Sequence, residues 1–310
     1  MTRYNKELTL AVNLVKKATE ITEWFRSKGF KSFLKADQSP VTLADFASQI
    51  FIVSELQNHF SDDQIIAEEE NLTYFGKKAE NSVKQCFNEL NIEGINNVKD
   101  YIEYRGKSSK RQWTVDPIDG TIGFQKGLFY AVGVGLMVNS VPKACAIATP
   151  NYHGKSLAIF SAEQGYGTHV SYDTNNFIPT KVSQINKLND FRFCHSLHYD
   201  KPWIIKFARN IGIINFIQVD SMVKFAMVAD GTADLYIKPI NLERSFTWDF
   251  LPGDLIVREA GGKVTDIDGT PLRYKESKSI FTKPGIISSN GLLHKEILRQ
   301  IKEYLPELFR

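Results

Sequence analysis

The sequence WTVDPIDGT, residues 113–121, decides how the rest of the chain is interpreted. Trp113–Val115 predicts a buried strand, and Pro117 is expected to turn the chain where that strand ends. The turn returns Asp119 to the side of Asp116. Two carboxylates so close repel each other unless a cation lies between them, so the stretch predicts a site for a hard cation.

Gly120 and Thr121 directly follow the second carboxylate. A helix that begins here would direct its free backbone N–H groups into the same cavity, where they could hold a phosphate. Alternatively, Asp116 and Asp119 are ordinary turn residues, and Asp119 is only a helix cap. The stretch on its own leaves both interpretations open.

Two further acidic positions are candidates for the same site. Glu68 comes directly after Gln64–Ala67, a short run that predicts a buried strand, so a rigid sheet would hold its carboxylate in place. Glu70, at the end of the same acidic run, is expected in solvent. Asp249 precedes an apolar helix expected over 252–260, and it could equally be the N-cap of that helix.

The periodicity of apolar residues predicts both helices and strands in the first half of the chain. Helices are expected over 8–25, 46–60 and 78–90. Thr42 and Asp45 match a capping box at the start of the second helix. Asn139-Ser140 predicts a hairpin turn. The strands are expected over 64–67, 113–115, 130–138, 143–148 and 156–160.

Beyond the polar stretch 172–179, short strands alternate with helices, which predicts a layered α/β half. The strands are expected near 191–194, 216–219, 234–237, 263–265 and 286–288. The helices are expected near 201–210, 221–229, 252–260 and 291–304. A chain of 310 residues, at roughly 150 per domain, suggests two domains. We therefore expect an N-terminal α+β domain over 1–175 and a C-terminal α/β domain over 176–310.

Composition narrows the class of protein. Apolar residues make up 43% and charged residues 24%, which excludes a disordered or fibrous chain. Lys plus Arg minus Asp plus Glu is 38 − 35 = +3, so nucleic-acid binding is not expected. Cys86, Cys145 and Cys194 are too scattered for a disulfide framework or a cysteine zinc site. No secretory signal and no apolar stretch of about 20 residues is visible, so a soluble cytoplasmic protein is expected.

Four motifs occur in an order typical of one group of enzymes. They are DQSPVTLAD (37–45), EE (68–69), WTVDPIDGT (113–121) and WDFLPGDLIVREAGG (248–262). Together they resemble the lithium-sensitive, magnesium-dependent phosphatase superfamily of inositol monophosphatase and fructose bisphosphatase. Within it, residues 37–42, GF (123–124), HSLH (195–198) and DSMVK (220–224) are similar to the 3′(2′),5′-bisphosphate nucleotidases. The resemblance covers nearly the whole chain and implies an inositol-monophosphatase-like layered αβαβα sandwich of mixed α+β and α/β character.

The resemblance also implies roles for individual residues. The implied metal ligands are the carbonyl oxygen of Ile118 and the carboxylates of Glu68, Asp116, Asp119 and Asp249. Asp45 and Thr121 resemble the pair that orients and deprotonates the attacking water. The departing phosphate is expected on the Thr121 side chain and on the backbone amides of Gly120 and Thr121. Contacts to the remaining phosphate and the nucleoside, in the C-terminal domain, are expected from His195, Ser221, Lys224 and Lys238.

The implied reaction is hydrolysis of the 3′-phosphate of 3′-phosphoadenosine 5′-phosphate to AMP and phosphate by a metal-activated water. Two or three Mg²⁺ ions are the implied cofactors, with Li⁺ as an inhibitor and Na⁺ as a further candidate inhibitor. The expected partner is a small phosphonucleotide. Neither a nucleic acid nor a membrane is expected to bind, and the chain is expected to be a monomer.

Two other functions remain open at this point. One is an inositol polyphosphate 1-phosphatase or inositol monophosphatase that uses the same metal site. The other is a catalytically silent phosphonucleotide-binding protein, against which the complete acidic set argues. Ile122 replaces the basic residue expected before Gly123, which leaves the base preference open. His195 and His198 could also be ordinary surface or core histidines, and Lys224 an ordinary solvated lysine.

Overall fold

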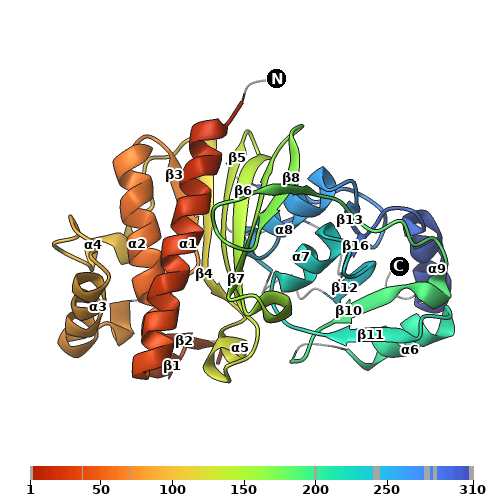
Figure 1. Ribbon diagram of the computed structural model, residues 1–310, viewed down its shortest axis with the longest axis horizontal. Coiled ribbons are helices and arrows are strands. Elements are labelled where there is room, and N and C mark those ends of the chain that lie inside the picture. The colour runs from red at the N-terminus through yellow and green to blue at the C-terminus, as the bar shows by residue number, and fades with distance from the viewer. Residues whose placement is uncertain are drawn as a thin grey trace.

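The computed structural model describes residues 3–36, 38–70, 72–198, 201–239, 245–275, 280–281 and 285–306. Asp37, the first residue of the 37–45 motif, lies outside the described residues, as do the outermost residues of the two expected domains. Helices and sheets alternate in five layers (Figure 1). This arrangement confirms the expected αβαβα sandwich.

The first sheet has seven strands in the order β3-β4-β5-β6-β7-β8-β9. Neighbouring strands are antiparallel except β3 and β4, which run parallel. Asn139 and Ser140 join β5 to β6 with φ angles of 52° and 63°, which confirms the expected hairpin turn. The strands are β3 Gln64–Ala67, β4 Arg111–Asp119, β5 Ala131–Val138, β6 Val141–Pro150, β7 Leu157–Glu163, β8 Gly167–Ser171 and β9 Ile178–Thr180.

Two long helices, α1 (Asn5–Lys28) and α2 (Leu43–His59), cover one face of this sheet (Figure 1). The shorter α3 (Lys77–Glu89) and α4 (Asp100–Glu103) pack against α2. The predicted capping box of α2 is confirmed. The Thr42 hydroxyl accepts a hydrogen bond from the Ala44 N–H, and the Asp45 carboxylate accepts one from the Thr42 N–H at 2.8 Å. This cap fixes Asp45 in the first turn of a buried helix.

The middle layer consists of α7 (Val223–Ala229) and α8 (Thr247–Glu259). The expected start of the second helix at residue 252 is wrong, because α8 begins at Thr247 and contains Pro252 in its interior. Trp248 and Phe250 are buried between the sheets, and their packing extends the helix to the N-terminal side of Pro252. The early start places Asp249 within the first turn.

The second sheet has five strands in the order β11-β10-β12-β16-β13. β10 is parallel to both of its neighbours, and β16 is antiparallel to both of its own. Two helices, α6 (Pro202–Asn210) and α9 (His294–Tyr304), form the outermost layer (Figure 1) and share a core with the sheet. The strands are β10 Arg192–His195, β11 Asn215–Gln218, β12 Leu235–Pro239, β13 Lys263–Asp266 and β16 Gly285–Ser289.

Short elements complete the described fold. The paired strands are β1 (Ser32–Leu34) with β2 (Pro40–Thr42), and β14 (Arg273–Tyr274) with β15 (Ile280–Phe281). The short helix α5 (Thr121–Gln125) follows β4, and 3₁₀ turns span Leu72–Tyr74, Tyr152–Gly154 and Leu188–Asp190.

The expected domain boundary at residue 175 stays a prediction. After that position, β9 still pairs with β8 in the first sheet. The next strand along the chain, β10, begins at Arg192 and belongs to the second sheet. Within the described ranges, no helix combines the length and apolar character needed to cross a membrane. Cys86, Cys145 and Cys194 are buried thiols, which agrees with a packing role.

Candidate active site

Strand β4 carries two of the predicted carboxylates. The predicted turn at Pro117 is wrong, because β4 continues through Pro117 to Asp119. The register against β5 shifts between Asp116 and Asp119, so the strand bulges where a turn was expected. A bulge accommodates proline, which has no N–H for the strand ladder. Both aspartates therefore lie at the same end of a buried strand.

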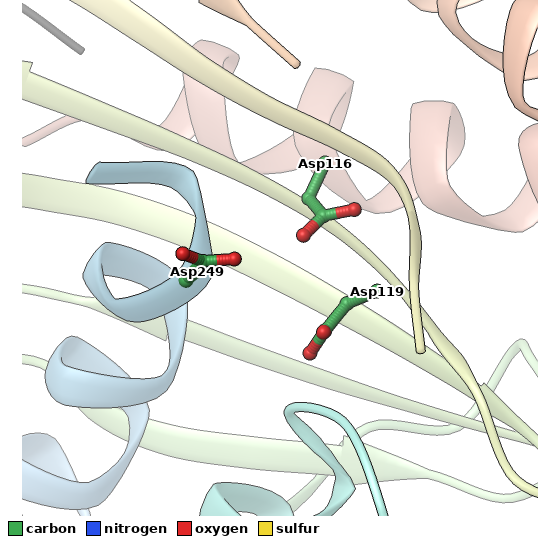
Figure 2. A group of neighbouring side chains, drawn as sticks. All are labelled: Asp116, Asp119 and Asp249. Atoms are coloured by element: carbon green, nitrogen blue, oxygen red, sulfur yellow. The ribbon is translucent and has the colours of Figure 1, made fainter. Parts of the chain in front are cut away.

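Asp116, Asp119 and Asp249 form a compact group, and their carboxylates face a common space (Figure 2). One oxygen from each lies within 4.8 Å of the other two. Asp249 comes from the first turn of α8 and accepts a hydrogen bond from the Phe246 N–H at 2.9 Å. Neither Asp249 nor Asp119 is an N-cap residue, because the N-cap residues are Phe246 for α8 and Gly120 for α5. Asp249 instead accepts from the N-cap N–H as the third residue of α8.

Ionisation of all three carboxylates is unfavourable unless a cation lies among them. Burial raises the pKa of Asp116 well above its ordinary value, and the charges of Glu68 and Asp119 raise it further. Burial and the charge of Asp249 raise the pKa of Asp119 to about 7. The buried Oδ1 atom of Asp116 has no hydrogen-bond partner among the described residues. A hard cation would offset these charges, and the Oδ1 atom of Asp116 could coordinate it. The residues therefore fit a Mg²⁺ site.

Strand pairing places Glu68 beside this group. Ala67 in β3 pairs with Val115 in β4, so Glu68 follows the end of β3 next to Asp116, which lies within β4. The Glu68 N–H donates to the Val115 carbonyl at 3.2 Å, which continues the ladder by one bond. The sequence argument that a rigid sheet holds this carboxylate is therefore confirmed.

Lys35, which follows β1, is the residue of this site that sequence reasoning missed. Its ammonium lies 2.9 Å from the Glu68 carboxylate and 2.6 Å from the buried Glu69 carboxylate. Burial alone would lower the pKa of Lys35, but the two glutamates raise it above its ordinary value. Glu70 is exposed, as predicted. No local signal marks Lys35, because the chain must fold back over 33 residues to bring it to Glu68.

Asp45 and Thr121, the predicted catalytic pair, lie together. The Thr121 hydroxyl is 3.3 Å from Oδ1 of Asp45 and 3.2 Å from the Ile118 carbonyl oxygen. The other oxygen of Asp45 accepts from the N–H and hydroxyl of Thr42 at 2.8 and 2.6 Å. Burial raises the pKa of Asp45 to about 7, although the hydrogen bonds from Thr42 act in the opposite direction and lower it. A carboxyl with this pKa can take up and release a proton near neutral pH.

The segment before α7 approaches the same place from the second half of the chain. Gly120 adopts a left-handed φ of 91°, and a Cβ there would lie 3.0 Å from the Ser221 Cβ. Ser221 has a φ of 67°, a conformation that costs a non-glycine residue about 1–3 kcal/mol. The next residue, Met222, donates its N–H to the Asp119 carboxylate. The unusual backbone at Ser221 thus accompanies a direct link between the two halves.

Lys224 and Lys238 also lie near the acidic group. Lys224 is only 3% exposed, so the alternative of an ordinary solvated lysine is wrong. Its ammonium donates to the Val219 carbonyl at 3.1 Å, and burial lowers its pKa to about 8. The Lys238 ammonium lies 4.4 Å from the centroid of the Phe250 ring. Both lysines oppose the rise in the pKa of Asp119 that burial causes.

The two histidines of the HSLH motif have different surroundings. The His195 ring, at the end of β10, lies 6.1 Å from the Phe216 ring between centroids. His198 bonds to the Asp220 carboxylate through Nδ1. The structure thus gathers the predicted metal, catalytic and phosphate residues around the end of β4, whereas the assigned contacts of His195, Ser221, Lys224 and Lys238 with a nucleotide stay predictions.

Known proteins resemble this chain over nearly its whole length. Residues 4–305 match the inositol monophosphatase family. A 3′,5′-bisphosphate nucleotidase 2 of Arabidopsis thaliana is 31% identical, with 98% of each chain covered. A 3′(2′),5′-bisphosphate nucleotidase of Emericella nidulans is 30% identical, with 97% of this chain and 99% of the relative covered. The solved structure of an IMPase from Thermotoga maritima superposes with a TM-score of 0.70 at 24% identity, covering 98% and 99% of the two chains.

Proposed function

Because the chain belongs to the inositol monophosphatase family, we propose that it is a 3′(2′),5′-bisphosphate nucleotidase that hydrolyses the 3′-phosphate of 3′-phosphoadenosine 5′-phosphate. The products are AMP and inorganic phosphate. The observation that carries this proposal is the meeting of the Asp116, Asp119 and Asp249 carboxylates beside the Asp45–Thr121 pair. The nucleotidase relatives, which align over nearly the full chain, support the nucleotide as substrate.

We propose Mg²⁺ as the metal ion. The ligands would be the Ile118 carbonyl and the carboxylates of Glu68, Asp116, Asp119 and Asp249. When bound there, Mg²⁺ would neutralise charge on the phosphate and lower the pKa of a nearby water. The preference of Mg²⁺ for oxygen ligands supports this choice, because each proposed protein ligand is an oxygen atom. Competition by Li⁺ and Na⁺ for this site is part of the same proposal.

The role proposed for Asp45 and Thr121 is to orient the attacking water and remove its proton. The water oxygen forms a bond to phosphorus while the bond from phosphorus to the ribose 3′-oxygen breaks, and the departing 3′-oxygen takes up a proton from solvent water to become the hydroxyl of AMP. The proton of the water passes to Asp45, with the Thr121 hydroxyl at 3.3 Å holding the geometry. A carboxyl whose pKa is about 7 is suited to this transfer near neutral pH. No covalent bond to the protein is required.

The first turn of α5 is proposed to hold the phosphate that leaves. Gly120 is the N-cap and Thr121 the first residue of this helix, so both backbone N–H groups lack an intrahelical acceptor. Such amides favour an anion. The left-handed φ of Gly120 and its closeness to Ser221 leave little room for a side chain there. A monomeric state and a cytoplasmic location stay predictions.

Phosphate release by the purified chain with Mg²⁺ tests this function. The substrates are 3′-phosphoadenosine 5′-phosphate, inositol 1,4-bisphosphate and inositol 1-phosphate, each with and without Li⁺. We expect the bisphosphonucleotide to have the highest kcat/KM, and Li⁺ to inhibit its hydrolysis. A preference for inositol 1-phosphate would contradict the nucleotide assignment, and release from none of the three would contradict the enzyme.

A further inference from the structure

We propose that the buried side chain of Gln49 positions Glu68 for the metal ion by holding the backbone of the next residue, Glu69. This inference rests on the proposed function, since it concerns the Mg²⁺ site of the proposed reaction. Gln49 lies in α2 and is fully buried. It is a positioning residue, because it acts through the backbone that carries Glu68 and not on the substrate.

Pro117 ends the hydrogen-bond ladder between β3 and β4 at Glu68. The Glu68 N–H donates to the Val115 carbonyl at 3.2 Å. In a parallel pair the next bond would run from the N–H of residue 117 to the Glu68 carbonyl. Residue 117 is a proline and has no N–H, so this bond cannot form. The ladder therefore does not reach the backbone of Glu69, although that residue is buried.

The side-chain amide of Gln49 supplies the partners that the ladder does not. Its Oε1 atom accepts from the Glu69 N–H at 2.8 Å, and its Nε2 atom donates to the Glu69 carbonyl at 2.6 Å. Nε2 also donates to the Ile102 carbonyl in α4 at 3.3 Å, so both of its N–H groups are used. Arg105 donates to the same Glu69 carbonyl at 2.8 Å. Glu68 is thus fixed between the ladder on one side and the amide of Gln49 on the other.

The face of α2 that presents Gln49 also carries the proposed general base. Asp45, Ser48 and Gln49 are spaced by three and four residues, so they lie on one face of the helix, and all three are fully buried. The Ser48 hydroxyl donates to the Pro117 carbonyl, in the bulge of β4, at 3.1 Å. One helix face therefore holds the general base, the bulge of β4 and the end of β3 in a single frame.

Removing the amide of Gln49 would take away the partner of the buried Glu69 N–H and one partner of its carbonyl. Buried backbone groups seek new partners when theirs are lost, so the segment that carries Glu68 would shift. Residues that hold a metal ligand in place typically contribute 10–100-fold to metal affinity. We expect the effect on the affinity for Mg²⁺, because the amide acts on the segment of a proposed ligand.

Binding of Mg²⁺ without substrate tests this inference. The rise in unfolding temperature with Mg²⁺ concentration gives the dissociation constant of Mg²⁺. Gln49→Met should raise this constant by about 10–100-fold. Gln49→Asn keeps an amide but is one methylene shorter, so it should also raise the constant, and it carries the test if Gln49→Met does not fold. Gln112→Met is the matched control, because Gln112 is also fully buried but bonds to Gln64 at the other end of the β3–β4 pair. It should leave the constant unchanged.

Phosphate release by the same variants separates this inference from the proposed function. In Gln49→Met the Mg²⁺ concentration for half-maximal rate should rise by the same factor, while KM for the nucleotide at saturating Mg²⁺ should change little. If no substrate is hydrolysed while Mg²⁺ binding still depends on Gln49, the proposed function fails and the inference stands. If the native protein hydrolyses the nucleotide and both Gln49 variants keep the native dissociation constant, the inference is overturned. An equal rise in Gln112→Met would also overturn it, because the effect would then follow from the loss of any buried amide in this strand pair.

Discussion

Replacing Asp119 by Asn should change stability in opposite directions with and without Mg²⁺. In the folded chain without metal, burial and the charge of Asp249 raise the pKa of Asp119 from 3.8 to about 7. Protonation of Asp119 therefore stabilises the folded state relative to the unfolded state to its full extent below pH 3.8. This stabilisation is lost as the pH rises through 7. This difference in pKa corresponds to at most about 4 kcal/mol. Because solvent reaches part of the Asp119 side chain, we expect about 2 kcal/mol.

Urea unfolding in EDTA and in Mg²⁺ measures this effect. At pH 8 in EDTA, Asp119→Asn should be the more stable protein, since the amide carries no charge and still accepts from the Met222 N–H. At pH 5 the difference in free energy of unfolding between the variant and the native protein should be smaller. With Mg²⁺ the native protein should gain stability and the variant little, which reverses their order. The exposed Asp190→Asn is the control and should follow the native protein. A variant that is less stable than the native protein in EDTA at pH 8 would refute the reasoning.

Three other substitutions test separate parts of the structure. Asp45→Asn should reduce phosphate release by about 10²–10⁴-fold, which is the usual contribution of a general base. Mg²⁺ should still raise the unfolding temperature of this variant. Turnover close to that of the native protein would show that Asp45 takes no part in the reaction. Lys35→Gln should destabilise the metal-free protein by about 2 kcal/mol in urea, because Glu68 and Glu69 lose their shared partner; an increase in stability would contradict that role. Phe193→Ala should cost about 3–5 kcal/mol, since its side chain is fully buried between the second sheet and the outer helices, and a cost below 1 kcal/mol would contradict the packing.

Local signals were sufficient for three features, namely the start of α2 with Asp45, the hairpin between β5 and β6, and the position of Glu68. The Thr42–Asp45 capping box could be found from residue types three apart, and its geometry holds Asp45 in place. The hairpin turn at Asn139-Ser140 follows from backbone preferences alone. Glu68 was placed because a short apolar run precedes it, and parallel pairing with β4 then brings it to Asp116. In these cases the determining contacts lie within a few residues or within one strand pair.

Contacts between distant segments could not be predicted in this way. Lys224 looks like a solvated residue on a short helix, yet α7 lies between two sheets and every residue of it is buried. Pro117 signals a turn, but pairing with β5 carries the strand past it as a bulge. The Glu68 partner of Lys35 lies 33 residues away along the chain. Such contacts depend on how the layers stack, which a local pattern does not specify.

In the proposed reaction, water attacks the phosphorus of the 3′-phosphate beside the carboxylates of Asp116, Asp119 and Asp249. Hydrolysis of 3′-phosphoadenosine 5′-phosphate with Mg²⁺ in H₂¹⁸O, followed by mass spectrometry of both products, tests it most directly. The predicted result is one ¹⁸O atom in inorganic phosphate, unlabelled AMP, and loss of both products in Asp45→Asn. Adenosine 3′-phosphate as the product, or ¹⁸O in the nucleotide, would contradict the claim.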